Sequence, residues 1–212
     1  MARIDHLYMP DENMDSLYTS QNALVRFVHS QRLDKIVEFV AKANLPKGAR
    51  ILDAGCGEGH LIQRFHQQMP LHEYFGVDIM DNAVRQSHER VPFAQVKRMD
   101  LDSLQFPDNY FDVVTCTEVL EHVYEYQDVI AELTRVLKPN GLLIITHPNE
   151  VLWTFSRLLL GRRPLRVPDH VNAFVPGFMK RRVGLRVMAQ QNLPFGLPFG
   201  LSLTCLLAFQ KK

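Results

Sequence analysis

Residues 53–59 read Asp-Ala-Gly-Cys-Gly-Glu-Gly, and the fold of the chain is inferred outward from this stretch. A short apolar run, Ala49–Asp53, leads into it, and residues with helical spacing, His60–Gln68, follow it. Glycine at every second position removes Cβ atoms, so a ligand can approach the backbone closely. A glycine-rich turn between a strand and a helix is the context of a nucleotide-binding loop, although the loop alone is a weak signal.

Strands and helices alternate through the residues that follow this loop. The apolar patterns predict strands over Glu73–Asp78, Phe93–Met99, Phe111–Cys116 and Gly141–Thr146, and helices over Asp81–Glu89 and Tyr126–Leu137. Asp81 is expected to cap its helix. The alternation predicts an α/β, doubly wound, mostly parallel sheet with helices on both faces. Because such folds bind ligands at the carboxyl ends of their strands, we expect the chemistry at that edge.

The chain is predicted to form a single domain, because 212 residues suit one hydrophobic core. We expect residues 1–44 to form a polar arm or lid and a helix, and residues 45–150 to form the ligand-binding core. Residues 151–183 are expected to be an insertion on the substrate side, and residues 184–212 a pair of strands. The elements predicted in these outer parts are helices over Gln21–Ala43, Val151–Leu160 and Pro176–Val183, and strands over Leu185–Asn192 and Leu201–Phe209.

Charge is distributed unevenly along the chain. Residues 1–156 carry a net charge of −8 and residues 157–212 carry +9, within an overall charge of +1. The asymmetry suggests an anionic partner for the basic part, and a solvated basic face is an equally open interpretation. The basic segment 157–186 follows an apolar helix, which favours an anionic, partly apolar substrate or peripheral membrane contact. Nucleic acid is disfavoured, because few aromatic residues interleave with the basic ones.

The cysteine pattern and the N-terminus bear on the compartment. Cys56, Cys116 and Cys205 form no CxxC pair and match no zinc spacing, so no metal site is predicted. The N-terminus lacks the apolar core of a secretory signal. Leu193–Phe209 is uncharged but interrupted by prolines and glycines, which favours a turn and a strand over a membrane span. We therefore expect a reducing, cytoplasmic setting. The oligomeric state cannot be derived from the sequence.

Acidic residues around the loop indicate the charge of its ligand. Asp53 lies immediately before the glycines and Glu58 lies among them. A diphosphate needs backbone N–H groups and no nearby anion, so these carboxylates favour a ligand with cationic groups. S-adenosylmethionine carries two, a sulfonium and an amino group. Asp53 could instead cap the helix that follows.

Two further acids end the second and third predicted strands. Asp78 can accept both hydroxyls of a ribose, as the acid that follows the glycines does in dinucleotide enzymes, and Ile79 would pack on an adenine. Asp100 can accept the adenine amino group while the Leu101 N–H donates to the ring. Core packing for Ile79 and a simple turn for Asp100 are the alternatives.

The complete set of motifs, in this order, resembles class I S-adenosylmethionine-dependent methyltransferases. The segments are Asp-x-Gly-x-Gly-x-Gly at 53–59, Gly-Val-Asp at 76–78, Asp-Leu at 100–101, Phe-Asp-Val-Val at 111–114, Glu-Val-Leu-Glu-His at 118–122 and Leu-Lys-Pro-x-Gly at 137–141. The resemblance covers about residues 45–150 and is strongest to the subgroup that acts on small molecules and lipids, including quinone-biosynthesis enzymes. It implies a Rossmann-like, seven-stranded sheet with the last strand antiparallel.

The resemblance also implies which residues bind the donor. Glu118 would lie beside the methionine part of S-adenosylmethionine. Independently of the resemblance, the helix from Gln21 and the arm before it could close over the cofactor, where Tyr18 and Arg32 could reach its carboxylate. The other residues expected to bind the cofactor are Asp53, Gly55, Cys56, Gly57, Asp78, Ile79, Asp100 and Leu101.

Methyl transfer needs alignment of donor and acceptor and no covalent intermediate or metal. A general base helps when the acceptor must lose a proton. His122 and His170 are the candidate catalytic bases, and His147 is a further candidate at the expected rim of the pocket. Each has a structural alternative.

The predicted function is methyl transfer to a small-molecule or lipid-like acceptor, leaving S-adenosylhomocysteine. Three alternatives are open: an RNA or protein methyltransferase, a catalytically silent partner subunit that binds the cofactor, and an NAD-dependent oxidoreductase. The last is disfavoured, because Gly55, Gly57 and Gly59 have Gly-x-Gly-x-Gly spacing where dinucleotide loops have Gly-x-Gly-x-x-Gly.

Overall fold

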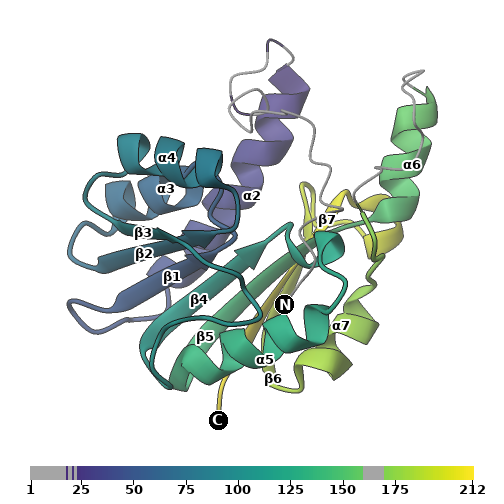
Figure 1. Ribbon diagram of the computed structural model, residues 1–212. Coiled ribbons are helices and arrows are strands. Elements are labelled where there is room, and N and C mark those ends of the chain that lie inside the picture. The colour runs from purple at the N-terminus through teal and green to yellow at the C-terminus, as the bar shows by residue number, and fades with distance from the viewer. Residues whose placement is uncertain (1–17, 19–20, 22, 160–169) are drawn as a thin grey trace.

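The computed structural model describes residues 18 and 21 and residues 23–159 and 170–212 (Figure 1). Seven strands form one sheet in the order β3-β2-β1-β4-β5-β7-β6. β1 to β5 are parallel, and β7 runs antiparallel to both of its neighbours. The strands are β1 (Arg50–Ala54), β2 (Glu73–Asp78), β3 (Gln95–Arg98), β4 (Phe111–Thr117), β5 (Leu137–Pro148), β6 (Arg186–Leu193) and β7 (Thr204–Gln210). The predicted Rossmann-like sheet with an antiparallel last strand is confirmed.

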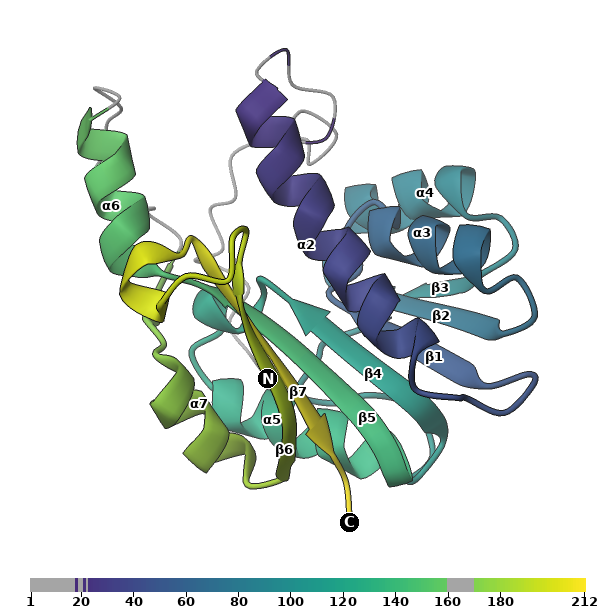
Figure 2. The same ribbon diagram turned by 180° about the vertical axis from the view of Figure 1, so that it is seen from behind.

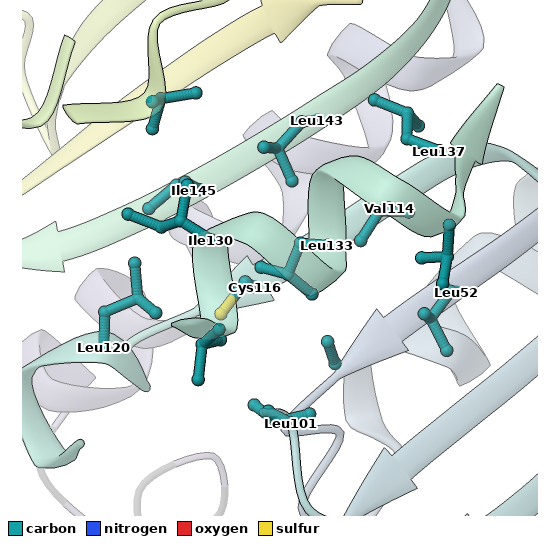
Figure 3. Close-up of a cluster of buried hydrophobic side chains, with 14 of the residues drawn as sticks. Leu52, Leu101, Val114, Cys116, Leu120, Ile130, Leu133, Leu137, Leu143 and Ile145 are labelled. Atoms are coloured by element: carbon teal, nitrogen blue, oxygen red, sulfur yellow. The ribbon is translucent and has the colours of Figure 1, made fainter. Parts of the chain in front are cut away.

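Helices cover both faces of the sheet (Figures 1 and 2). The helices within the described residues are α2 (Ala23–Ala41), α3 (His60–Gln68), α4 (Asp81–Arg90), α5 (Tyr126–Val136), α6 (Glu150–Leu159) and α7 (Pro176–Val183), and the same residues form two short 3-10 turns, η2 (Leu120–His122) and η3 (Phe199–Leu201). Side chains alternate between the faces of each strand: Leu52 packs in the core beneath α5 and α7, whereas Ile51 packs beneath α2 and α3. Figure 3 shows the first of these cores, where Ile130 and Leu133 of α5 lie over the sheet.

The glycine-rich loop is fastened to the end of β2. The backbone N–H groups of Gly55 and Cys56 donate to the Val77 carbonyl at 2.8 and 2.9 Å, and that of Gly57 donates to Asp78 Oδ2 at 2.8 Å. Gly55 has a φ of +77°, and a Cβ built on it would lie 2.4 Å from Val119 Cγ2. The left-handed backbone and the close side chain both require glycine at this position.

Some predicted boundaries were wrong for local reasons. The third strand begins at Gln95 rather than Phe93, because the Phe93 ring stacks on His66 outside the sheet. The segment from Leu137, predicted as the end of a helix and a turn, joins β5 because Leu137 pairs with Phe111. Asp81 does not cap α4: Met80 holds the cap position, and its N–H donates to Asp78 Oδ1 at 2.9 Å.

The outer parts of the chain extend beyond the carboxyl edge of the sheet. The first half of α2 and most of α6 project past the ends of β4 and β5 (Figures 1 and 2). The predicted arm, apart from Tyr18, and the basic loop 161–168 lie outside the described residues, as does the Arg157 side chain. Among the helices that the structure describes, none combines the length and apolar character needed to cross a bilayer.

Replacing Gly55 by alanine tests the fit of the loop. Both Gly55→Ala and the control Gly48→Ala place a Cβ on a backbone with positive φ, but the Cβ at residue 48 would have no atom of the described residues within 4 Å. We expect the control to lose about 1–2 kcal/mol of unfolding free energy. Gly55→Ala should lose a further ~1–3 kcal/mol from the clash with Val119. Urea denaturation measures both losses, and equal losses would contradict the steric argument.

Candidate functional site

Four carboxylates gather at the carboxyl edge of the sheet. Asp53 lies in β1, Asp78 ends β2, Asp100 follows β3 and Glu118 follows β4. The N–H groups of residues 55–57, which an anion-binding loop would offer to a phosphate, already donate to the end of β2. The site therefore presents acceptors rather than donors at this point, which suits a cationic ligand better than a diphosphate.

Asp53 is buried inside the sheet, with 2% of its surface exposed. Its Oδ1 accepts a hydrogen bond of 2.8 Å from Thr115 Oγ1. Burial raises the pKa of Asp53 to about 7, the nearby Asp78 adds to the rise, and the Thr115 bond opposes it. The alternative role as a helix cap is wrong, because the cap position of α3 is Gly59 and no side chain bonds there.

Glu58 does not face the ligand side as the sequence suggested. Its carboxylate is buried and lies 3.3 Å from His60 Nε2 and 3.9 Å from Arg90 Nη2. Arg90 Nε also donates to the Glu58 carbonyl at 2.9 Å. Glu58 thus fastens the loop to α4, and its charge is balanced by Arg90.

Asp78 already accepts two backbone hydrogen bonds, from Gly57 and Met80, one on each oxygen. Burial raises its pKa, and these bonds oppose the rise. Each carboxylate oxygen has a second lone pair, so capacity for ribose hydroxyls is left. Ile79 beside it is half-buried rather than part of the core.

Asp100 and Leu101 lie in the turn after β3. Asp100 Oδ1 accepts from the Asp102 N–H at 3.4 Å, the turn geometry that was its alternative interpretation. The Leu101 side chain is buried in the core beneath α5. Their predicted contacts with an adenine stay predictions.

An ion pair joins α2 to the loop after β4. Arg32 Nη1 lies 3.3 Å from Glu118 Oε2, and both side chains are largely buried. Arg32 Nη2 also lies 3.5 Å from the Tyr18 hydroxyl. Burial raises the pKa of Glu118, and the guanidinium of Arg32 opposes the rise. Glu118 has a φ of +55°, an uncommon conformation for a non-glycine residue and one often found at functional sites.

On the other side of Glu118, η2 meets the segment that begins at His170. The N–H groups of Val171 and Asn172 donate to the Glu121 carbonyl at 2.8 and 3.0 Å. The rings of His122 and His170 lie edge to face, with centroids 4.7 Å apart. The two histidines predicted as bases are thereby brought together.

Two acids that the sequence did not single out complete this cluster. His170 Nδ1 lies 2.5 Å from Glu150 Oε1. Glu121 is 1% exposed, and neither of its carboxylate oxygens has a hydrogen-bond partner among the described residues. Burial raises its pKa well above the usual range. Within the described residues, Glu121, His122 and His170 form one group whose potential metal-ligating atoms lie within 4.8 Å of one another. The prediction that no metal is used stays a prediction.

His147 is placed differently from the expectation, and the predicted cofactor contact of Cys56 stays a prediction. His147 is not at the rim: it lies inside β5, is fully buried, and burial lowers its pKa to about 4. Cys56 lies beneath the loop against Gly76, and burial raises the pKa of its thiol well above the usual range. An unreactive Cys56 thiol fits a packing role.

Comparison with known proteins places these features in context. A family model for a methyltransferase domain matches residues 52–145. The ubiquinone biosynthesis O-methyltransferase, mitochondrial, of Schizosaccharomyces pombe is 32% identical over 159 residues, which cover 72% of this chain and 55% of that protein. The trans-aconitate 2-methyltransferase of Variovorax paradoxus is 28% identical, over 60% of this chain and 49% of that protein. The chain thus spans about half the length of these curated relatives.

A solved structure supports the fold independently. The PH0226 protein from Pyrococcus horikoshii OT3 superimposes with a TM-score of 0.71 at 20% identity, covering 93% of this chain and 96% of that chain. At this identity the likeness bears on the arrangement of the sheet and helices alone.

Asp53→Asn tests whether the buried carboxylate faces a cationic ligand. The amino group of S-adenosylhomocysteine favours the ionised carboxylate, so its affinity for the wild type should rise as the pH increases through about 7. Asp53→Asn should bind about 10-fold or more weakly above pH 7 and lose this pH dependence, since a hydrogen bond to a charged group contributes about 1.5–3 kcal/mol. Calorimetric titration across the pH range measures both effects.

Thr115→Val is the matched control for this experiment. It keeps the Asp53 carboxylate but removes the hydrogen bond that opposes the rise of its pKa. The pH dependence of binding should persist with a higher midpoint. An Asp53→Asn variant that retained the wild-type pH profile would contradict the role of Asp53.

Proposed function

The chain belongs to the class I S-adenosylmethionine-dependent methyltransferases, and from this premise we propose that it methylates a small-molecule or lipid-like acceptor that carries negative charge. S-adenosylmethionine is the methyl donor of this family and supplies an activated methyl group on a sulfonium. The main support for this methyl donor is the row of carboxylates beside the glycine-rich loop, whose N–H groups already donate to the end of β2.

The residues of the carboxyl edge fit such a donor. Gly57 has a φ of +51°, and a Cβ built on it would meet no atom of the described residues within 4 Å, so these residues leave the loop open to close approach there. Asp78 and Ile79 would bind the ribose and the adenine face, and Asp100 and Leu101 the adenine edge. Asp53, Glu118 and Arg32 would bind the methionine part, with Arg32 facing its carboxylate.

The acceptor side is bordered by exposed apolar side chains from three elements, which we call the apolar rim. Its members are Phe27 of α2, Val151, Phe155 and Leu158 of α6, and Phe195, Leu197 and Leu201 of the β6–β7 connection. Phe27 stacks on Phe195 with ring centroids 6.0 Å apart, so two of the elements meet. The side-chain amide of Asn149, just before α6, donates to the Phe199 carbonyl at 2.7 Å, which joins the start of α6 to the β6–β7 connection.

The apolar rim supports a lipid-like acceptor. Soluble proteins rarely expose a contiguous apolar patch larger than a few hundred Å², and larger patches mark binding surfaces. The basic segment 157–186 begins within the last residues of α6 and supplies the opposite charge for an anionic acceptor or an anionic lipid surface. We therefore favour an acceptor that approaches between α2 and α6, from solution or from a membrane surface.

In the proposed mechanism the chain aligns the methyl donor with the acceptor and removes a proton from the acceptor. Alignment of reacting groups can lower a barrier by about 7–11 kcal/mol, and a general base adds roughly 10²–10⁴-fold. His170 or His122 would take the proton of an acceptor hydroxyl or amine. The buried Glu118 and Arg32 pair would hold the donor end, and the N–H groups that bind the Glu121 carbonyl fix the histidine segment over η2.

Labelled methyl transfer into fractions of a cell extract tests the acceptor class. With S-adenosylmethionine labelled on the methyl group, we expect label in the lipid or small-molecule fraction. Asp78→Ala, which removes the residue assigned to the ribose, should reduce the incorporation strongly. Label confined to RNA or protein would support those alternatives, and no incorporation despite cofactor binding would support a silent partner subunit.

Vesicle binding tests the apolar rim. The wild type should co-sediment with phosphatidylcholine vesicles that contain phosphatidylglycerol, and less with phosphatidylcholine alone. Phe195→Ser should weaken binding roughly 10-fold, since a buried Phe contributes about 1.5–3 kcal/mol. The control is Leu71→Ser, which removes an equally exposed apolar residue (both 66%) before β2, away from the carboxyl edge. Equal binding by both variants would contradict membrane contact at the rim.

A further inference from the structure

A histidine and a carboxylate from separate elements form a close pair on the acceptor side of the site. His170 Nδ1 and Glu150 Oε1 are 2.5 Å apart, and both side chains are 12% exposed. Glu150 is the first residue of α6, whereas His170 begins the segment that leads to α7. Because the pair is short and sheltered from water, it restricts the orientation of the two side chains more than an ordinary surface ion pair does.

Both partners are mounted on fixed backbone. The segment after His170 is bonded to η2 through the N–H groups of Val171 and Asn172, and the Asn172 amide donates to the Val123 carbonyl at 2.6 Å. Glu150 follows the buried Asn149, whose amide donates to the carbonyls of Phe199 and Ser202. The pair therefore joins the end of β5 to the turn after β4 with little freedom on either side.

The charged groups around the pair belong to the candidate site. Glu118 and Glu121 interact electrostatically with Glu150, and Glu118 also interacts with His170. Arg32 forms an ion pair with Glu118 and interacts electrostatically with Glu121. The His122 ring lies against the His170 ring. His170 is thus oriented by Glu150 within the cluster that borders Glu118, the residue assigned to the methionine end of the donor.

We propose that Glu150 is a positioning residue that holds His170 as the general base for the acceptor. This inference rests on the proposed function. The carboxylate accepts from the Nδ1–H and so fixes the neutral tautomer in which Nε2 is the basic nitrogen. The same arrangement, a base oriented by a third group, recurs in enzymes that activate a weak nucleophile.

The proton follows a defined route. As the acceptor oxygen or nitrogen bonds to the methyl carbon, the carbon–sulfur electron pair stays with sulfur, and the acceptor proton passes to His170 Nε2. The imidazolium that results is balanced by the Glu150 carboxylate. No oxidant, reductant or further reactant is needed.

A structural role is the competing explanation. An acid in the first turn of a helix stabilises that helix through its dipole, whatever lies opposite. Such a role would not require a particular tautomer of His170. The tautomer therefore distinguishes positioning from simple stabilisation.

Nitrogen-15 NMR of histidine-labelled protein reads the tautomer directly, at a pH where the ring is neutral. In the wild type, His170 should carry its proton on Nδ1, and Glu150→Ala should shift it predominantly to Nε2. Glu150→Gln should keep the Nδ1–H form, because the amide oxygen can still accept. The matched control is Asp81→Ala, which removes a first-turn acid from α4, and it should leave His170 unchanged. A wild-type His170 protonated on Nε2, or no change in Glu150→Ala, would overturn the proposal.

The second measurement is the rate of methyl transfer to the fraction of the cell extract that takes up the labelled methyl group. Glu150→Ala should lower kcat about 100-fold, within the range that a general base contributes, while the KM for S-adenosylmethionine stays unchanged. Glu150→Gln should recover part of the loss. An unchanged kcat in Glu150→Ala would overturn the role of Glu150. Failure of the wild type to bind S-adenosylhomocysteine would instead overturn the proposed function. The NMR experiment does not depend on that binding, so the two failures can be distinguished.

Discussion

The attachment of the glycine-rich loop to the end of β2 is the constraint on which the site depends. Three consecutive N–H groups, those of Gly55, Cys56 and Gly57, are directed to Val77 and Asp78, so the loop has few donors left for an anion. The same bonds fix the Asp78 carboxylate beside the loop. Many nucleotide sites share this glycine-rich sequence pattern, but here the bonded loop favours ligands that bring hydrogen-bond donors or positive charge of their own.

Burial of acids at one edge of the sheet has an energetic consequence. Desolvation raises the pKa of Asp53, Asp78, Glu118 and Glu121, and among the residues that the structure describes only Glu118 has a buried cation, Arg32, within ion-pair distance. In the described part of the chain, burial disfavours the ionised form of these carboxylates, and the positive charge of a cationic ligand would offset that cost. We attribute the accumulation of carboxylates to binding rather than to stability, because buried acids seldom stabilise a fold on their own.

Much of the sheet could be predicted because its strands are apolar runs that end at turn residues. The bounds of β2, α3 and α7 agree with the patterns, whereas β3 and β5 differ where Phe93 and Leu137 make contacts that no local pattern encodes. The acids at or just beyond the ends of β1 to β4 could be located because parallel strands end at one edge. The partners of Glu118 and His170 could not be derived, since Arg32 and Glu150 come from distant helices, although Glu150 is the last acid before a basic segment.

We infer that the carboxyl edge of the sheet binds a cationic adenosyl ligand rather than a dinucleotide. Thermal unfolding of the full chain with S-adenosylmethionine, S-adenosylhomocysteine and NAD tests it most directly. A ligand present at 100 times its Kd stabilises the native state by about 2.7 kcal/mol, which is readily seen as a rise in Tm. We expect such a rise in Tm with the two adenosyl ligands and none with NAD, whereas stabilisation by NAD alone would identify the edge as a dinucleotide site.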